Sequence, residues 1–221
     1  MATEDLTGFT EVDGGGDLTV TASKVDVATQ ANNVNNYVHE SKSIGTSDFD
    51  WDFEHNVTAV SGTYSTGWFV GCSTTTGTLE NGFSIGCVFD STSITPYLAD
   101  YDDSVNVDAS TAGSNLSLST LYYSSLSRVG NTLTWDIYTD SGRTSLSQSI
   151  SMTISNTTAS YDEAYAESSY NWGDTSATTY FVQNLDYKEG GGGGRIMGSL
   201  AGVGGLAGAG GIAGIGGGLA G

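Results

Sequence analysis

The strongest hydrophobic pattern in this chain is an alternation over residues 47–60, SDFDWDFEHNVTAV. Phe49, Trp51 and Phe53 occupy odd positions, and acidic residues occupy the even positions from 48 to 54. Because successive side chains of a strand point to opposite faces, this alternation predicts a β-strand with rings on one side and carboxylates on the other. Each buried ring removes roughly 150 Å² or more from water. We expect the rings to centre the core, and the carboxylates to stay in water, bind cations or do chemistry.

Shorter alternations recur at intervals of roughly ten residues, which is typical of an all-β sandwich. The expected strands are 9–12, 18–28, 37–40, 66–74, 83–90, 93–101, 120–128, 132–138, 146–154 and 179–187. A turn at Gly130–Asn131 predicts a hairpin, and Pro96, the one proline, predicts an edge or bent strand. Residues 108–115 are expected to form a loop, and the pattern over 159–170 is ambiguous because 162–167 could form a helical turn. No window shows a convincing helical period.

The patterning therefore predicts one domain with a tail. The expected architecture is a two-sheet antiparallel jelly-roll sandwich over residues 18–188, preceded by an N-terminal arm at 1–17. Residues 189–221 form a Gly/Ala/aliphatic tail outside the domain.

The net charge of the chain restricts the kinds of molecule that it is expected to bind. The formal net charge is -19, from 6 Lys+Arg and 25 Asp+Glu, so the chain repels phosphate backbones and nucleic acid is not an expected partner. Ser, Thr and Asn dominate the polar positions, as in proteins exposed outside cells. The first sixteen residues are acidic and lack the apolar segment of a secretion signal. Release inside a virus particle, an unusual exporter or a trimmed chain would each account for that combination.

The two cysteines, Cys72 and Cys87, each follow a glycine and lie in the expected strands 66–74 and 83–90. If the hairpin turn is centred on residues 75–82, the two thiols lie opposite each other. A non-hydrogen-bonded antiparallel pair has Cα atoms about 4.5 Å apart, which is within disulfide range. The alternative is two buried thiols that act as small hydrophobic side chains. Their spacing carries no zinc signature.

The segment TLYYSSLSRVGNTLTWDIYTDSGRTSLSQSISMTI resembles the concanavalin A-like (laminin G-like, legume-lectin-like) jelly-roll superfamily, in its Tyr-Tyr, Arg, Gly-Asn and aromatic positions. FDWDFEHNVTAVSGTYSTGWFVGCS is similar to an earlier strand pair of that fold, and NLDY to its closing strand. The resemblance extends over roughly residues 6–188 and depends on strand pattern. It implies two packed antiparallel sheets, and often glycan binding or adhesion. Such modules are common in phage and environmental viral proteins.

Catalysis is one use for the acidic strand face. Asp50, Asp52 and Glu54 resemble the Glu-x-Asp-x-Glu motif of laminarinase-type glycoside hydrolases, in which the first acid is the nucleophile and the last the acid/base. Retaining hydrolysis needs those carboxyls about 5–5.5 Å apart. Asp50 is shorter than the glutamate by a methylene, and the acidic positions continue outward to Asp48, as on a solvated face. The chain is therefore expected to be non-enzymatic.

Calcium is the one cofactor that the sequence suggests. Asp100, Asp102 and Asp103 supply hard oxygen ligands close together, but the glycine and distal glutamate of an EF-hand loop are missing. The alternative is a solvated acidic loop. His39 and His55 are far apart, and no Ser-His-Asp pattern can be assembled. His55 falls on the ring face of its strand and is expected to pack there.

Glycan binding has candidate side chains, because the C–H faces of sugars stack on aromatic rings. The candidates in the expected loops are Tyr170, Asn171, Trp172 and Asp174, together with Tyr97 and Tyr101. The combination of a ring, an amide and a carboxylate suits a sugar site. The alternative is that these rings line the core.

The tail has a period of three. Glycine recurs at every third position from 202 to 217, and the residues that follow are Val203, Leu206, Ala209, Ile212 and Ile215. A polyproline-II-type helix has this period and no internal hydrogen bonds, so its backbone groups need partners. The tail is therefore expected to bundle with copies of itself or to dock on another protein. A membrane-spanning or membrane-contacting helix and a flexible low-complexity tail are the alternatives.

The leading hypothesis from the sequence is a non-enzymatic structural or surface protein of a virion, of the fibre, decoration or vertex type. Its sandwich would face outward and bind host surface glycans, and its tail would mediate assembly into a homo-oligomer or docking on other virion proteins. Its rivals are a subunit of an extracellular filament or sheath, a laminarinase-type glycoside hydrolase, and a protein whose tail interacts with membranes.

Overall fold

The computed structural model of the chain describes residues 3–28, 30, 33–62, 64–76, 82–90, 93–101, 109–154, 161–171 and 178–188. In chain order its elements are η1 (Leu6–Gly8), β1 (Thr10–Asp13), β2 (Leu18–Val20), β3 (Lys24–Val27), β4 (Asn35–Ser41), β5 (Phe49–Ala59), β6 (Ser65–Ser73), β7 (Gly82–Asp90), β8 (Ser93–Tyr101), β9 (Ala109–Ala112), β10 (Tyr122–Val129), β11 (Thr132–Tyr138), β12 (Leu146–Thr153), β13 (Glu163–Asn171) and β14 (Thr179–Lys188).

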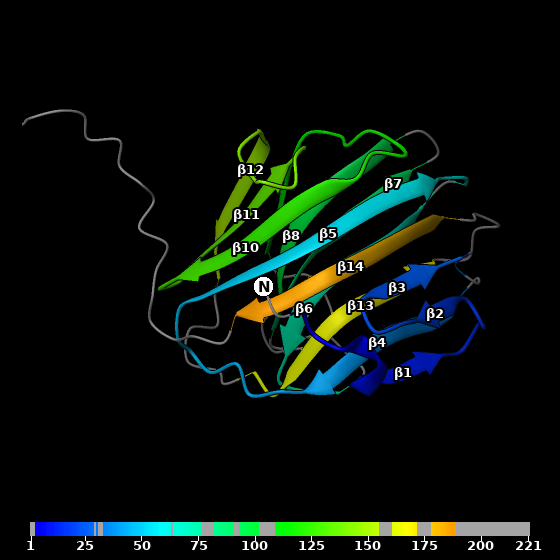
Figure 1. Cartoon of the computed structure of the whole chain (residues 1–221), viewed down its shortest axis with the longest axis horizontal. Helices are drawn as coiled ribbons and strands as arrows, with labels where there is room; N and C mark the ends of the chain where they lie inside the picture. Colours follow the sequence, from blue (N-terminus) through cyan, green and yellow to red (C-terminus); the bar gives the residue numbers. More distant parts are fainter. Residues whose placement is uncertain are drawn as a thin grey trace, which may run out of the picture.

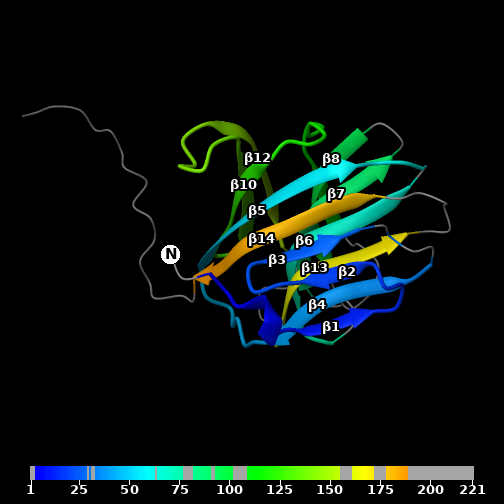
Figure 2. The same cartoon turned by 45° about the vertical axis from the view of Figure 1, so that its right-hand side comes forward.

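The strands form two seven-stranded antiparallel sheets that pack face to face (Figure 1). Sheet A has the order β1-β4-β13-β6-β7-β8-β9, and sheet B has the order β12-β11-β10-β5-β14-β3-β2. In the turned view the strands β5, β14, β3 and β2 of sheet B lie in front of β6, β13 and β4 of sheet A (Figure 2). The predicted all-β sandwich is confirmed.

Strand β5 supplies the centre of the core, as the alternation predicts. Phe49, Trp51, Phe53 and His55 are all buried, and they face sheet A. The ring of Trp51 lies 5.9 Å from that of Phe83. Burial of the β5 rings therefore joins the two sheets.

His55 continues the ring face of β5 beyond the phenylalanines. Its ring stacks on Phe69 at 4.5 Å, and a hydrogen bond of 3.1 Å joins its Nε2 to Oγ of Ser124. Trp135 Nε1 donates to the same hydroxyl at 3.0 Å. Complete burial lowers the pKa of His55 to about 3, so the imidazole is neutral in the folded protein.

Several expectations about local structure are wrong. Residues 18–28 form the β2–β3 hairpin instead of one strand, and β9 lies where a loop is predicted. The short Ala/Ser/Thr strand β9 has no hydrophobic alternation to reveal it. Strand β13 replaces the possible helical turn, and a bulge between Tyr165 and Glu167 breaks its period of two. The predicted arm belongs to the sandwich, because β1 pairs with β4 and Leu6 is buried in the core.

Strand β8 contains Pro96 but pairs with β7 on one side and β9 on the other, so the expected edge position is wrong. The Pro96 carbonyl accepts a hydrogen bond from Gly113 N, on the side where the absent N–H of Pro96 would point. Strand β9 pairs only with Tyr97–Asp100 and ends before this point. Pro96 therefore lies just outside the β8–β9 ladder, at a position that accepts a hydrogen bond but cannot donate one.

The expected juxtaposition of the cysteines is wrong. The β6–β7 register places Cys72 opposite Phe83 and Cys87 opposite Gly67. The two sites are four residues apart along the strands, or about 13 Å. Both thiols are free and buried, and burial raises the pKa of each well above its usual value. The alternative of two small hydrophobic side chains is confirmed.

No helix within the described ranges is both long and apolar enough to cross a bilayer. The tail positions Val203, Leu206, Ala209, Ile212 and Ile215 lie outside the described residues.

A carboxyl group is buried between the sheets at Glu167. The Tyr180 hydroxyl donates to its Oε1 at 2.6 Å. Burial raises the pKa of Glu167 to about 8; the Tyr180 bond lowers it, while the charges of Asp13 and Asp17 raise it further. At neutral pH the group is therefore mostly protonated, which avoids the cost of an isolated buried charge.

The shifted pKa values of Glu167 and His55 predict how the stability of the fold depends on pH. Between about pH 4.5 and 8 an unfolded chain loses the Glu167 proton that the folded protein keeps, so stability falls as pH rises, by roughly 1 kcal/mol per unit where the difference is complete. Between about pH 6.5 and 3 the His55 imidazole is protonated in an unfolded chain but neutral in the folded protein, so the free energy of unfolding falls as the pH decreases.

We therefore expect Glu167→Gln, whose amide oxygen can still accept from Tyr180, to flatten the alkaline side of the stability profile. The acidic side, which His55 sets, should keep its slope and serves as the internal control. Urea unfolding between pH 4 and 9 measures both sides. An unchanged alkaline slope in the variant would show that Glu167 is ionised in the folded protein.

The burial of both cysteines predicts that a thiol reagent such as Ellman's reagent reacts with neither in the native protein, and with both in urea. The intact mass under non-reducing conditions should correspond to two free thiols per chain. Recovery of a Cys72–Cys87 bond would contradict the register described above.

Candidate functional site

The outer face of sheet A carries a row of aromatic side chains. On β7, Phe83 and Phe89 point into the core, where they contact Trp51 and Tyr180. The alternate positions of β7, and their partners on neighbouring strands, therefore point outward. One set of register partners on this face runs from β4 to β8: Tyr37, Ser168, Trp68, Gly86 and Tyr97. We call this set the aromatic row.

The three rings of the aromatic row are regularly spaced. Tyr37 and Trp68 are two strands apart, as are Trp68 and Tyr97, so each step is about 10 Å. All three side chains are half-buried, and so present part of their surface to solvent. Between Trp68 and Tyr97 stands Gly86, where a Cβ would lie 2.1 Å from the Gly67 carbonyl oxygen. The floor between these rings is therefore bare backbone.

The next row on the same face is more buried and supports the first. Tyr101 packs edge-on against Trp68 at 6.5 Å, and the Ser84 hydroxyl donates to its phenol oxygen at 3.4 Å. Burial raises the pKa of Tyr101 to about 12, so the phenol remains neutral. On the other side, Tyr165 packs against Tyr37 at 6.1 Å. These contacts hold the outer rings in place.

A hydrogen-bonded His39–Glu163 pair lies beside these rings at the start of β13. His39 Nδ1 is 2.8 Å from Glu163 Oε2, and the hydroxyls of Ser41 and Thr76 donate to Oε1 at 3.0 and 2.9 Å. Burial raises the pKa of Glu163, but the bonds from His39, Thr76 and Ser41 outweigh it and lower the pKa below its usual value. The Glu163 carboxylate therefore bonds to three protein side chains and has little capacity left to accept a hydrogen bond from a ligand.

Three of the rings proposed for glycan binding share this outer face. Tyr97 and Tyr101 lie on β8 and Tyr170 on β13, so the expectation that they lie on loops is wrong. Asn171 ends β13, while Trp172 and Asp174 lie outside the described residues. Sequence analysis did not select the other two rings of the aromatic row, Tyr37 and Trp68.

Of the three proposed calcium ligands, Asp100 alone lies in the described part of the chain. Asp100 is opposite Phe83 on the core side of β8 and is 1% exposed, so it is not part of a solvated loop. Asp102 and Asp103 lie outside the described residues. Across the ranges that the structure describes, no three His, Cys, Asp or Glu side chains are grouped as a metal site would require.

Of the four acids on this face of β5, Asp48 is exposed, Asp50 and Glu54 are half-buried, and only Asp52 is buried. Asp52 is 2% exposed and lies between Lys188 Nζ at 2.5 Å and Arg143 Nε at 3.5 Å. Asp50 accepts from the Ser125 hydroxyl at 2.7 Å. These contacts tie β5 to the end of β14 and to the β11–β12 turn.

Glu54, the third acid of the proposed catalytic motif, accepts a hydrogen bond of 2.7 Å from Gln183 Nε2. Asp50 and Glu54 are four residues apart on an extended strand, so their Cα atoms are separated by about 13 Å. Between them stands the ion-paired Asp52. Each of the three carboxylates of this motif therefore already has a partner within the protein.

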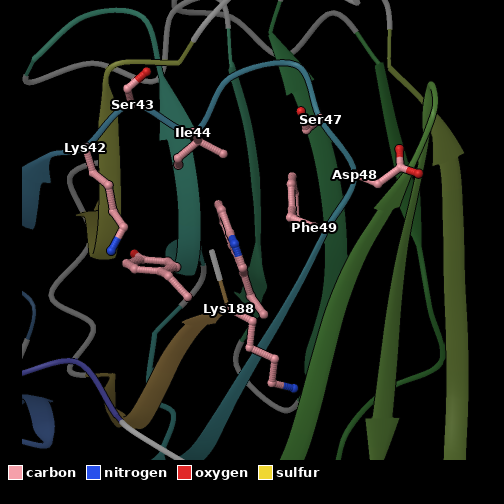
Figure 3. Close-up of a pocket in the computed structure, with 9 residues that line it drawn as sticks. Lys42, Ser43, Ile44, Ser47, Asp48, Phe49 and Lys188 are labelled. Carbon is pink, nitrogen blue, oxygen red and sulfur yellow. The ribbon is translucent and has the colours of Figure 1, made fainter. Parts of the chain in front are cut away.

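A cleft of about 240 Å³ opens where β5 begins and β14 ends (Figure 3). It is lined by Lys42, Ser43, Ile44, Ser47, Asp48, Phe49, Trp51, Tyr187 and Lys188. In Figure 3, Ile44 and Phe49 flank the cleft from the 42–48 segment and from β5. Lys42 Nζ lies 5.0 Å above the Tyr187 ring and 3.3 Å from Glu4. The exposed lining of the cleft is more polar than apolar, because the rings among its residues are largely buried.

The ion pairs of Asp52 predict a measurable stability difference. Asp52→Asn leaves Lys188 and Arg143 without their shared counter-charge, and should lower the free energy of unfolding by about 2 kcal/mol. The matched control is Glu54→Gln on the same strand face, whose partner Gln183 is uncharged; its loss should stay below about 0.5 kcal/mol. Urea unfolding measures both, and equal losses would contradict the proposed role of the cluster.

Comparison with known proteins identifies the fold. No protein-family profile and no curated protein matches the sequence. Among solved structures, the chain is similar to a functionally unknown protein from Saccharomyces cerevisiae (TM-score 0.60, 6% identity, 84% of this chain and 98% of that chain). It is also similar to a legume lectin-like domain from Entamoeba histolytica (0.60, 12%, 84% and 92%). A third similar structure is the CBM2 module of the evolved Dit of Lactobacillus casei BL23 phage J-1 (0.50, 16%, 84% and 96%). At such low identities the similarity concerns the fold alone, and the sandwich has the concanavalin A-like, legume-lectin-like jelly-roll fold.

Proposed function

We propose that this protein is a non-enzymatic glycan-binding module and that the aromatic row is its binding surface. The observation that supports this most is the regular step of about 10 Å between its three half-buried rings. Aromatic side chains offer apolar faces on which sugar rings stack. The step is close to the length of a disaccharide unit in an extended glycan, so Tyr37, Trp68 and Tyr97 would contact alternate sugars of one chain.

The chemistry of the row favours a neutral glycan. None of its described residues carries a charge, and Ser168 supplies a hydroxyl that both donates and accepts hydrogen bonds. The chain as a whole has a net charge of -19. Sulfated or uronic-acid chains would be repelled by that field, and neutral ones would not.

We place this module on the outside of an assembly of identical chains, with the virion surface as the first location. A stack of three rings binds weakly by itself, and several copies on one particle would raise the avidity. The similarity to a phage Dit module supports a virion protein of the fibre, decoration or vertex type. In this proposal the C-terminal tail connects the module to other copies or to the particle. An extracellular filament or sheath would use the same module and tail.

Hydrolysis is the weaker alternative. The three carboxylates of the β5 motif already have partners among Ser125, Lys188, Arg143 and Gln183, and they lie on sheet B, on the opposite side of the sandwich from the aromatic row. A glycan held on the aromatic row would not reach them.

Removing the central ring tests the proposal. Trp68→Ala should weaken binding to a neutral β-linked hexasaccharide about tenfold or more, because a stacked ring contributes on the order of 1 kcal/mol beyond the area that it buries. Titration calorimetry, with affinity electrophoresis against soluble neutral polysaccharides, provides the measurement. The matched control is Tyr123→Ala, a half-buried ring on the outer face of sheet B, which should bind as the unmodified protein does.

Two results would count against the proposal. One is equal affinity of the Trp68→Ala and unmodified proteins for every neutral glycan tested. The other is release of sugar that disappears in Asp50→Asn/Glu54→Gln, which would support the hydrolase instead.

A further inference from the structure

The edges of the two described sheets are β1, β9, β12 and β2, and β12 differs from the other three. Strands β1, β2 and β9 have only four, three and four residues, and β1 also carries Glu11 and Asp13. Strand β12 has eight residues, LSQSISMT, with no charged side chain and no proline. Natural proteins protect a sheet edge by keeping it short or by charging it, because its unpaired N–H and C=O groups otherwise pair with another strand. Strand β12 has neither protection.

The hydrogen bonds between β11 and β12 show which backbone groups form the outer edge of β12. Ile154 N donates to Asn131 O at 2.9 Å, so these two residues are a hydrogen-bonded pair of the ladder. Hydrogen-bonded and non-hydrogen-bonded pairs alternate in an antiparallel ladder, and the register continues unbroken from this pair to Gln148. The residues whose N–H and C=O groups point away from β11 are therefore Ser149, Ser151 and Thr153. The side chains of all three are exposed.

Two side-chain contacts agree with this assignment and hold β12 extended. Thr134 Oγ1 and Ser151 Oγ are 3.0 Å apart, as expected for a non-hydrogen-bonded pair, in which the side chains are closer. The Gln148 amide donates to Ser114 O at 2.9 Å and accepts from Ser114 N at 2.8 Å. Strand β12 is thus anchored on one side by β11 and through Gln148 by the segment after β9, while its outer edge stays open.

We propose that β12 pairs with β12 of a second copy, antiparallel and about a two-fold axis at Ser151, so that the two copies of sheet B become one continuous sheet. In this register Ser151 faces Ser151 of the second copy, and Ser149 of each chain faces Thr153 of the other. All the outward-facing positions are then used, in about six backbone hydrogen bonds. Hydroxyl side chains that face each other across the two strands add to the pairing. An axis at Ile150 would instead face Thr153 with Ser147, which the bulge takes out of register.

The charge distribution explains why a second copy can approach at this edge. Each chain has a net charge of -19, so two copies repel each other unless their acidic groups stay apart. On β11, Asp136 lies opposite Ser149. In the proposed dimer the two Asp136 side chains are separated by three strand spacings and four residues, or about 20 Å, more than twice the screening length at physiological salt. Pairing through β1 would instead bring Glu11 and Asp13 close to their own copies.

The symmetry of this pairing sets the orientation of the aromatic rows. A two-fold axis that relates antiparallel strands of one sheet is perpendicular to the sheet, so equivalent faces of both copies point to the same side. Both aromatic rows therefore face one direction and can bind one glycan surface together, which raises avidity without any new contact to the glycan. This consequence rests on the proposed function, whereas the strand pairing itself does not.

Cysteine cross-linking of the full chain tests the pairing, because the two native cysteines are buried. Ser151→Cys should form a disulfide-linked dimer under mild oxidation, since facing Cα atoms of a hydrogen-bonded pair are about 5.5 Å apart, within disulfide range. The matched control is Thr19→Cys, an exposed position of β2 at the other edge of sheet B. Intact mass measures the yield of dimer at about 0.1 mM protein, because an interface of this size is weak. We expect at least a fivefold higher yield from Ser151→Cys.

Mixing two variants distinguishes the proposed register from random collision. Ser149→Cys and Thr153→Cys should each give little dimer alone, because each lies about 13 Å along the strand from its own copy. Mixed together, they should give the dimer of the two variants in at least fivefold higher yield. The proposal is overturned if Ser151→Cys gives no more dimer than Thr19→Cys. It is also overturned if Ser149→Cys and Thr153→Cys cross-link as well alone as they do together.

These substitutions leave the sandwich unchanged, because each replaces an exposed side chain. None of the outcomes depends on glycan binding. Failure of the cross-links therefore leaves the proposed function standing, and failure of glycan binding leaves the strand pairing standing.

Discussion

Burial of the β5 ring face between the two sheets is the interaction on which the rest of the sandwich depends. A sheet with one apolar face must bury that face against another layer, and β5 provides the bulkiest such face in the described chain. Trp51 and Phe49 contact Phe83 of sheet A, and His55 stacks on Phe69. Because β5 also pairs with β10 and β14, its position sets the register of sheet B. The rows of side chains on the outer faces follow from this packing.

Several polar groups enter this core, and each is accommodated by becoming neutral or by pairing. His55 is held uncharged among aromatic rings, and Glu167 keeps its proton beside Tyr180. On the opposite face of β5, Asp52 is paired with Lys188 and Arg143. The same strand therefore has an apolar face that joins the sheets and a polar face that holds a turn and the end of the last strand in place.

The aromatic row depends on strand order in a way that no local pattern reveals. Tyr37, Trp68 and Tyr97 are far apart in the chain and become neighbours because β13 lies between β4 and β6, and β7 between β6 and β8. Bulges in β6 and β13 shift the alternation after Trp68 and Tyr165, so both Phe69 and Val70 can reach the core while Trp68 points outward. The candidate site is thus a property of the pairing. The cleft, in contrast, follows from where the last strand ends.

The all-β class, the two-sheet sandwich and most strands, including the ring face of β5 and the β10–β11 hairpin, could be predicted from the residue pattern, because a period of two in a half-buried strand is a local signal. It also located Tyr97, Tyr101 and Tyr170, but not the face that they share. Three features became visible only in the folded protein: the separation of Cys72 from Cys87, the burial of Asp52 and Asp100, and the alignment of Tyr37 and Trp68 in one row. Each of these depends on the register between strands distant in sequence, on bulges, or on charged partners from other elements, and none of those leaves a pattern within a single strand.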